Sequence, residues 1–164
     1  MPEEIKSAGS ERPRGAGRSV ALLRSRFNAA VVDGLLAGAK SELLACGVVD
    51  EDIEVFEVPG AFELPLAARE AGRTGRFDAI VALGAVIRGE TDHYEHIARA
   101  ATHGLEAAAR ETAVPVGFGL LTVVRAEQAL ERSRPGPDNK GAEAARAALA
   151  LAEALDGIRD GSGG

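Results

Sequence analysis

The sequence predicts a three-layer α/β/α sandwich around a four-stranded parallel sheet, and three observations lead to that prediction. From Arg18 onward, short apolar segments alternate with longer segments whose apolar residues recur every three or four positions. One short segment, DAIVALGAVI at 78–87, is apolar almost throughout, as is typical of a central parallel strand covered on both faces. Strands that alternate with helices of this length imply crossovers that place helices on both sides of a parallel sheet. With four strands, the fold is nearer the flavodoxin-like type than the dinucleotide-binding type.

The first half of the chain supplies two strands and two helices. Residues 19–25 form a short apolar run that ends in polar residues, which favours a strand, and 28–47 has helical periodicity and ends at a glycine. Residues 52–58 alternate and include β-branched side chains, which indicates the second strand. A helix is expected over 61–75 because Pro65 falls early enough to belong to its first turn.

The second half repeats this alternation and adds a final helix. Apolar segments at 78–87 and 114–123 predict the third and fourth strands, and 93–111 and 126–133 have helical periodicity. A long alanine-rich helix is expected over 140–158. The predicted order is therefore βαβαβαβαα, with no internal repeat and no second domain.

The composition fits one globular domain with an aliphatic core. The chain has 164 residues, of which 46% are hydrophobic and only 4% aromatic, so the packing must rest on Ala, Val, Leu and Ile. The net charge of -6 argues against nucleic acid as the main partner. The single cysteine, Cys46, excludes an intrachain disulfide and favours a cytoplasmic location, with Cys46 packed as a small apolar side chain.

Both ends of the chain depart from the domain pattern. Residues 1–17 are rich in Gly, Pro and charge and lack the apolar segment of a secretory signal, so a flexible arm is expected there. The glycine-rich residues 160–164 are expected to form a disordered tail, which leaves 18–159 as the domain. No apolar stretch approaches the roughly 20 residues of a membrane span, so no membrane association is expected.

Ligands of open parallel sheets bind beyond the carboxyl ends of the strands, which singles out four stretches of this chain. These are 26–28, 59–63, 87–93 and the residues after Thr122. In the first, Phe27 is either a hydrophobic plug over the sheet end or a face on which a planar ring stacks. Asn28 beside it either offers a donor and an acceptor to a ligand or caps the next helix.

The second stretch combines a turn with a helix start. Gly60 permits close backbone approach, and the amides of 61–63 are expected to be unpaired because they open a helix. Glu63 either compensates the helix dipole or accepts hydrogen bonds from a polyol.

The third stretch, IRGETDH, ends in a histidine at a helix start. Gly89 allows a tight turn, and its amide with those of Glu90 and Thr91 forms a cradle for an anion, although Thr91 or Asp92 is also a candidate helix cap. An imidazole can both give and take a proton near neutral pH, which suits His93 to proton transfer. His96 follows one turn later, but His103 is the only other histidine, so no metal site is expected.

Two basic residues flank the loop before the last helix. Arg132 either bonds the last carbonyls of its own helix or binds phosphate, and Lys140 is either a surface residue or a second cation for the same anion. No nucleotide P-loop motif is present, and the Gly-x-Gly at 117–119 lies inside a strand and lacks the third glycine of a dinucleotide fingerprint.

Together these segments resemble the 6,7-dimethyl-8-ribityllumazine synthase family of riboflavin biosynthesis. The matching segments are SRFN (25–28), VPGAFELP (58–65), LGAVIRGETDHYEHI (83–97), VPVGFGLLT (114–122), EQALER (127–132) and NKGAEAA (139–145). They follow the order and spacing of that family over about three quarters of the chain.

The resemblance implies a transferase that needs no metal or organic cofactor. Its reaction condenses 5-amino-6-(D-ribitylamino)uracil with 3,4-dihydroxy-2-butanone 4-phosphate, through imine formation, phosphate elimination and ring closure. It also implies self-association into pentamers with active sites between adjacent subunits, and a functional association with riboflavin synthase. Whether pentamers stay single, pair or close into a sixty-subunit shell is left open.

The resemblance also implies roles for individual residues. His93 would transfer protons, and Glu90, Thr91, Arg132 and Lys140 would bind the phosphate. The pyrimidine and its ribityl chain would be held by Phe27, Ala61, Phe62, Glu63, Ala85, Val86, Ile87 and Phe118, to which its position adds Asn28. Phe118 lies within the fourth strand rather than at its end, and the resemblance gives it, with Arg132 and Lys140, to the site of a neighbouring subunit.

One segment departs from the family pattern. Many members carry a glycine and an extra lysine before NKG, whereas this loop reads RPGPD (134–138), so a second basic group is missing. A non-catalytic flavin or lumazine binder, or a shell-forming protein of this fold, is the alternative function, but it has no need of His93 or Arg132. An electron carrier of the flavodoxin type is disfavoured because SRFNAAV lacks a phosphate loop rich in Ser and Thr.

Overall fold

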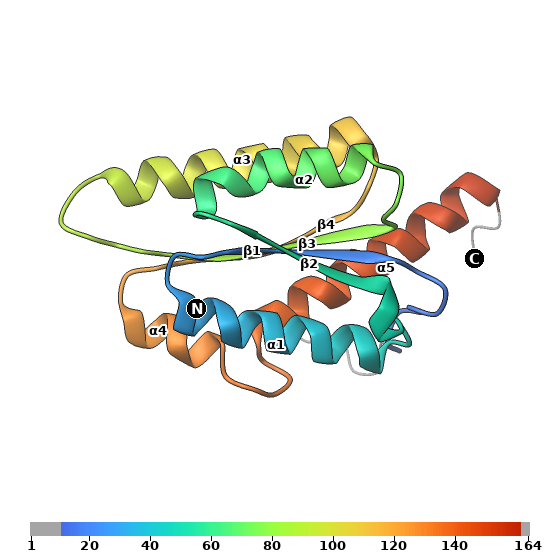
Figure 1. The fold of residues 1–164 in the computed structure, drawn as a ribbon, viewed down its shortest axis with the longest axis horizontal. Helices are drawn as coiled ribbons and strands as arrows, with labels where there is room; N and C mark the ends of the chain where they lie inside the picture. The colour runs from blue at the N-terminus through green and yellow to red at the C-terminus, as the bar shows by residue number, and fades with distance from the viewer. Residues whose placement is uncertain (1–10, 162–164) are drawn as a thin grey trace.

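The computed structural model describes residues 11–161 and confirms the α/β/α sandwich. Its strands and α-helices, in chain order, are β1 (Val20–Ser25), α1 (Ala29–Ala45), β2 (Ile53–Val58), α2 (Leu64–Arg73), β3 (Ala79–Ile87), α3 (His93–Thr112), β4 (Val116–Val123), α4 (Ala126–Arg132) and α5 (Lys140–Asp160). Helices α2 and α3 cover one face of the sheet, and α1, α4 and α5 cover the other (Figure 1).

The sheet is parallel throughout, with strand order β2-β1-β3-β4. The last residue pair between β1 and β3 joins Arg24 to Leu83, whereas β3 continues to Ile87, opposite Val123 of β4. The carboxyl end of β3 therefore extends past β1. Beyond Leu83, the groups of β3 that face β1 need partners other than a neighbouring strand.

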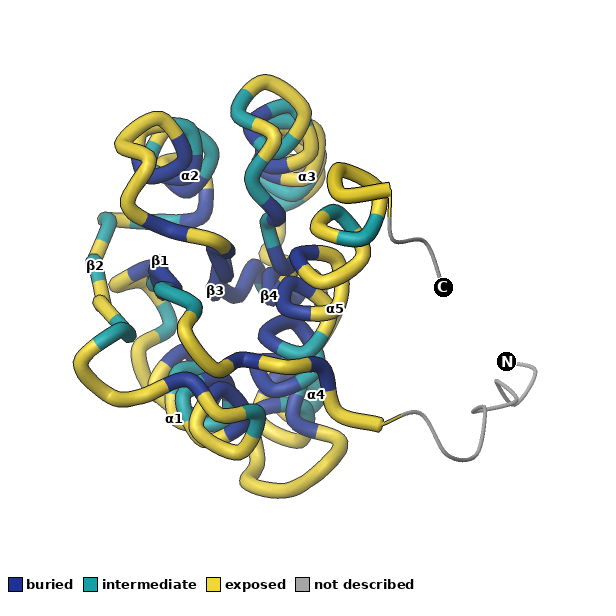
Figure 2. Tube along the Cα trace, turned by 90° about the vertical axis from the view of Figure 1, so that its right-hand side faces the viewer, coloured by how far each residue is buried: buried dark blue, intermediate teal, exposed yellow. Residues whose placement is uncertain are grey.

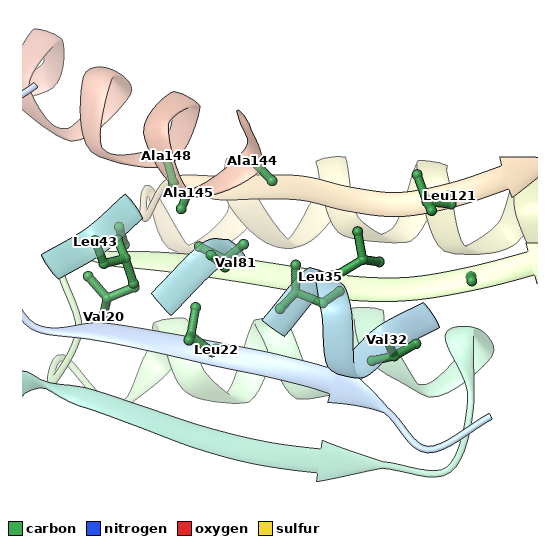
Figure 3. Close-up of a cluster of buried hydrophobic side chains, with 14 of the residues drawn as sticks. Val20, Leu22, Val32, Leu35, Leu43, Val81, Leu121, Ala144, Ala145 and Ala148 are labelled. Atoms are coloured by element: carbon green, nitrogen blue, oxygen red, sulfur yellow. The ribbon is translucent and has the colours of Figure 1, made fainter. Parts of the chain in front are cut away.

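The core lies on both faces of β3, in which only Ile87 is partly exposed. Figure 3 shows the cluster between the sheet and helices α1 and α5, where Leu22 and Val81 lie near Leu35 and the alanines of α5. The two helices pack closely, because a Cβ at Gly141 would lie 2.0 Å from the Leu35 carbonyl oxygen. Phe77 is the one aromatic residue of the core within the described region, as the composition predicts.

The edge strand β2 contrasts with this interior. Each of its residues is at least partly exposed, and Figure 2 shows it at the border of the buried strands.

Some element boundaries differ from those predicted. The helix expected over 61–75 is a short 3-10 turn, η2 (Ala61–Glu63), followed by α2, and Pro65 does fall in the first turn of α2. A second 3-10 turn, η1 (Asp50–Asp52), precedes β2. The fourth strand begins at Val116 rather than 114, after Pro115, which has no N–H to donate to a neighbouring strand.

The ends of the domain also differ from the expectation. Residues 1–10 and 162–164 lie outside the described part of the chain, but 11–17, expected in the flexible arm, lie against the end of α1. The amide of Gly15 donates to the Cys46 carbonyl at 2.8 Å, and Arg12 pairs with the buried Glu42 at 3.3 Å. At the other end, α5 includes Asp160, the first residue of the expected tail. Across 11–161, no helix combines the length and the apolar character needed to span a bilayer.

Candidate active site

A pocket of about 750 Å³ opens at the carboxyl ends of β1, β2 and β3, and we call it the sheet-end pocket. The predicted site residues that line it are Phe27, Asn28, Ala61, Phe62, Glu63, Ala85, Val86, Ile87, Thr91 and His93. They come from three strand exits and the first turn of α3, as expected for a ligand site of an open parallel sheet.

The exit of β1 presents an aromatic ring to this pocket. Phe27 is 72% exposed, so the plug interpretation fails within one chain: the ring is not covered by the fold. Its amide donates to the carbonyl of Pro59 at 3.2 Å, which ties it to the exit of β2. Asn28 stands at the N-cap position of α1, but its side chain does not cap the helix; its Nδ2 donates instead to the Ala85 carbonyl at 2.8 Å.

The exit of β2 supplies the 3-10 turn Ala61–Glu63. Of the three amides expected to be unpaired, that of Glu63 is paired: it donates to the Gly60 carbonyl at 3.2 Å, because the 3-10 turn closes a shorter hydrogen-bonded ring than an α-helix does. Phe62 is 64% exposed and the Glu63 carboxylate lies beside Gly60, so a second aromatic ring and an acceptor border the pocket.

The exit of β3 leads through an exposed loop into α3. Near the end of the strand, Ala85 and Val86 are buried and line the pocket. In the loop, Gly89 and Thr91 line the pocket and Glu90 does not. Thr91 accepts a long hydrogen bond of 3.4 Å from the His93 amide, while Asp92, at the N-cap position, makes no capping bond.

The first turns of α3 also contribute lining residues to which the sequence motifs assign no role. Tyr94, His96 and Ile97 also line the pocket. Their spacing from His93 is one, three and four residues, and helical periodicity alone places the last two on its face. Among residues 11–161, no group of three or more His, Cys, Asp or Glu side chains is arranged to hold a metal ion.

A second hollow, of about 510 Å³, lies around the loop between α4 and α5, and we call it the basic loop pocket. Arg132, Arg134 and Lys140 line it together with Glu131 and Glu143. The guanidinium of Arg132 donates to the Gln128 carbonyl at 3.0 Å, as its helix-end position allowed, and Lys140 pairs with Glu143 at 2.9 Å. Arg134 brings a further cation to the loop that lacks the extra lysine of the family pattern.

One buried amide organises the basic loop pocket. Asn139 is 2% exposed, and its Nδ2 lies within 3.0–3.1 Å of the carbonyls of Gly34, Ser133 and Arg134. Its Oδ1 accepts from the amide of Ala142 at 3.0 Å and so caps α5. The loop is therefore pinned at both ends by a single side chain.

Three predicted site residues lie away from the sheet-end pocket of their own chain. Arg132 and Lys140 belong to the basic loop pocket, built by α4 and α5 on the face of the sheet opposite α2 and α3. Phe118 lies in the edge strand β4, opposite Ala82 of β3. It is 49% exposed and lines neither pocket. One chain thus carries its predicted site residues in two separate places.

Cys46 lies outside both pockets and is unsuited to nucleophilic chemistry. Burial, with the carboxylate of Glu42 beside it, raises the pKa of the Cys46 thiol above its ordinary value. The reactive thiolate is therefore disfavoured, which supports the interpretation of Cys46 as a packed side chain.

The chain is similar to known proteins over most of its length. Residues 17–156 match the family model described as 6,7-dimethyl-8-ribityllumazine synthase. A protein named 6,7-dimethyl-8-ribityllumazine synthase from Halorhodospira halophila (strain DSM 244 / SL1) is 47% identical over 135 residues, which cover 82% of this chain and 86% of the relative. A protein of the same name from Anaeromyxobacter dehalogenans (strain 2CP-C) is 48% identical over 144 residues, covering 88% of this chain and 89% of the relative. The matched range includes every strand and both pockets.

Proposed function

The chain belongs to the 6,7-dimethyl-8-ribityllumazine synthase family, and we propose that its sheet-end pocket binds the pyrimidine substrate while an adjacent subunit completes the site. As a member of this family it is a transferase of riboflavin biosynthesis. It condenses 5-amino-6-(D-ribitylamino)uracil with 3,4-dihydroxy-2-butanone 4-phosphate and releases phosphate and water. The observation that carries the assignment of the site is the convergence of three strand exits on one pocket.

The pyrimidine half of the site is made of an aromatic face and main-chain groups. Phe27 stacks on the ring, and its high exposure supports this role, because an uncovered ring is available to a planar ligand. The backbone of Ala85–Ile87 hydrogen-bonds the edge of the uracil. The turn Ala61–Glu63 holds the ribityl-amino part through its backbone and the Glu63 carboxylate. Together these contacts fix the amine that attacks the ketone.

The loop before α3 and the residue that opens α3 face the reacting atoms. His93 lines the pocket and transfers protons as the imine forms, as phosphate leaves and as the second ring closes. Thr91, with the neighbouring Glu90, binds the phosphate through amides and hydroxyl at the start of α3. The condensation is chemically easy, so holding the two substrates together supplies most of the acceleration.

The groups that lie outside the sheet-end pocket come from the neighbour. Arg132 and Lys140 bind the same phosphate, and Phe118 covers the pyrimidine, each from the next subunit around a pentamer. Their separation from the sheet-end pocket of their own chain supports this arrangement, as does the exposure of Phe118, whose ring the fold leaves half uncovered. A ring of heterologous contacts uses two different faces of each subunit, as this division requires.

Two measurements test the proposal. Incubation with both substrates is expected to produce the absorbance of the lumazine, and its absence would contradict the reaction. For the shared site, chains carrying His93→Ala and chains carrying Arg132→Ala are co-expressed. Random mixing puts an intact His93 beside an intact Arg132 at about a quarter of the contacts, so activity is expected to rise above that of either variant alone.

The matched control uses two residues of the same pocket. Co-expression of His93→Ala with Phe27→Ala chains leaves every pocket with one defect, so no gain is expected. Equal behaviour of the two mixtures would contradict the shared site and leave the reaction itself in place.

We also propose a functional association with riboflavin synthase, supported by the chemistry, because that enzyme consumes the lumazine. A cytoplasmic location is supported by the single cysteine, which requires no oxidising compartment. Fractionation of cells, followed by detection of the protein, tests this location.

A further inference from the structure

We propose that Asn28 is a positioning residue: it holds Phe27 beside the sheet-end pocket and does not itself bind the substrate. This inference rests on the proposed function, in which Phe27 stacks on the pyrimidine. It differs from the expectation that Asn28 offers its donor and acceptor to the ligand.

The backbone of Asn28 is the first observation. Its φ of 59° and ψ of 48° lie in the left-handed region, where Asn28 and Ala113 are the two non-glycine residues of the described chain. Asparagine tolerates this conformation better than most residues, because its short polar side chain can bond locally. The left-handed residue turns the chain sharply between β1 and α1, so it sets the direction in which the preceding Phe27 points.

The side chain of Asn28 is the second observation. An N-cap asparagine ordinarily accepts a hydrogen bond from the first turn of its helix, but this one does not. Its Nδ2 reaches 57 residues along the chain to the Ala85 carbonyl at 2.8 Å. Ala85 lies two residues beyond Leu83, where the pairing of β3 with β1 ends. The amide of Asn28 therefore replaces the strand partner that β1 no longer supplies.

The same short segment is tied to β2. The amide of Arg26 donates to the Val58 carbonyl at 2.8 Å, and the amide of Phe27 donates to Pro59 at 3.2 Å. Residues 26–28 are thus fixed between the exits of β2 and β3, both of which line the pocket. Since Phe27 is 72% exposed, packing does not fix its position, and the three hydrogen bonds made by residues 26–28 do.

Two substitutions remove the side-chain amide donor of Asn28 and differ in what they keep. Asn28→Gly keeps access to the left-handed conformation and removes the donor, whereas Asn28→Asp keeps the size and places an acceptor against the Ala85 carbonyl. Loss of one hydrogen bond in each predicts a rise in KM for the pyrimidine of about 3- to 10-fold, with KM for the phosphate substrate changed by less than about 2-fold. Should one variant not fold, the other carries the same expectation.

The control is the second left-handed residue. Ala113 ends α3 and lines neither pocket, so Ala113→Gly relieves the same backbone conformation without touching the site. Both KM values are expected to stay at those of the unchanged protein. An equal rise in the pyrimidine KM of this control would show that added backbone flexibility, and not loss of the Asn28–Ala85 hydrogen bond, changes KM.

A double-mutant cycle with Phe27→Ala decides between positioning and direct contact. If Asn28 acts through the ring, Asn28→Gly adds no further rise in KM once the ring is gone. Additive effects would overturn the inference, as would a normal KM in Asn28→Asp. If Phe27→Ala itself leaves KM for the pyrimidine unchanged, the stacking proposed above fails; if it raises KM and Asn28→Gly does not, only the role of Asn28 fails.

Discussion

The sheet-end pocket and the basic loop pocket hold their functional side chains in opposite ways. In the first, Phe27 and His93 are exposed, and within residues 11–161 the His93 imidazole makes no hydrogen bond, so their positions follow from the backbone. In the second, Arg132 and Lys140 are each tied to their own helix, and the buried Asn139 pins the loop between them. Substitutions in the first should therefore change catalysis more than stability, and those at the centre of the second should change both.

The largest effect is expected at Asn139. Asn139→Ala removes a helix cap and takes the Nδ2 donor away from three carbonyls that are buried or partly buried, which we expect to cost about 3 kcal/mol of unfolding free energy. Urea denaturation measures this loss, and KM for the phosphate substrate should rise with it. Asn139→Asp keeps the capping oxygen but not the donors, so stability restored by aspartate would show that the carbonyl contacts contribute nothing.

His93→Ala tests the sheet-end pocket by its rate. Removal of the proton-transfer group is expected to lower turnover roughly 10- to 100-fold without abolishing it, since positioning remains. Because the side chain is exposed, the urea midpoint should stay close to that of the unchanged protein. Undiminished turnover at saturating substrate would remove this role from His93.

Arg132→Ala tests the other half of the proposed site. The loss of a charge-assisted hydrogen bond is expected to raise KM for the phosphate substrate roughly 10- to 30-fold and to leave that of the pyrimidine nearly unchanged. Steady-state kinetics with each substrate varied in turn makes the comparison. Equal weakening of both substrates would argue against a phosphate contact.

The smallest effect is expected at Arg134, the cation not foreseen from the family pattern. Its side chain is exposed beside Arg132 in the basic loop pocket, so Arg134→Gln should raise KM for the phosphate substrate only about 2- to 3-fold. The effect should vanish in high salt, because an exposed charge is screened. A salt-independent change would mean that Arg134 contacts the phosphate directly.

The two regions also differ in how far the sequence alone could predict them. The position of the sheet-end pocket could be predicted, because apolar segments that alternate with helical segments predict four parallel strands whose carboxyl ends lie at one edge of the sheet. The family motifs then named most of its lining. The 3-10 turn at Ala61–Glu63 was missed because its residues have no periodicity that separates it from the following helix.

The hydrogen bonds that hold each region in place could not be predicted from the sequence. Nothing local to Asn28 signals a bond to Ala85, since the residues are far apart in sequence and a helix cap is the common use of an asparagine there. Asn139 does cap its helix, but its three carbonyl contacts depend on how α1, α4 and α5 pack together. Such long-range hydrogen bonds follow from the assembled fold, not from motif or pattern.

The anchoring of residues 134–138 by Asn139 at their base has a consequence for how this enzyme can be altered. The turn between Arg134 and Asn139 carries no part of the hydrophobic interior, and 134–138 are all exposed. Its composition and length can therefore drift, or be redesigned by grafting, while the scaffold on either side keeps its shape. Changes of charge in this turn would then make only small adjustments to the surroundings of Arg132 and Lys140, because the helices that carry those two cations stay in place.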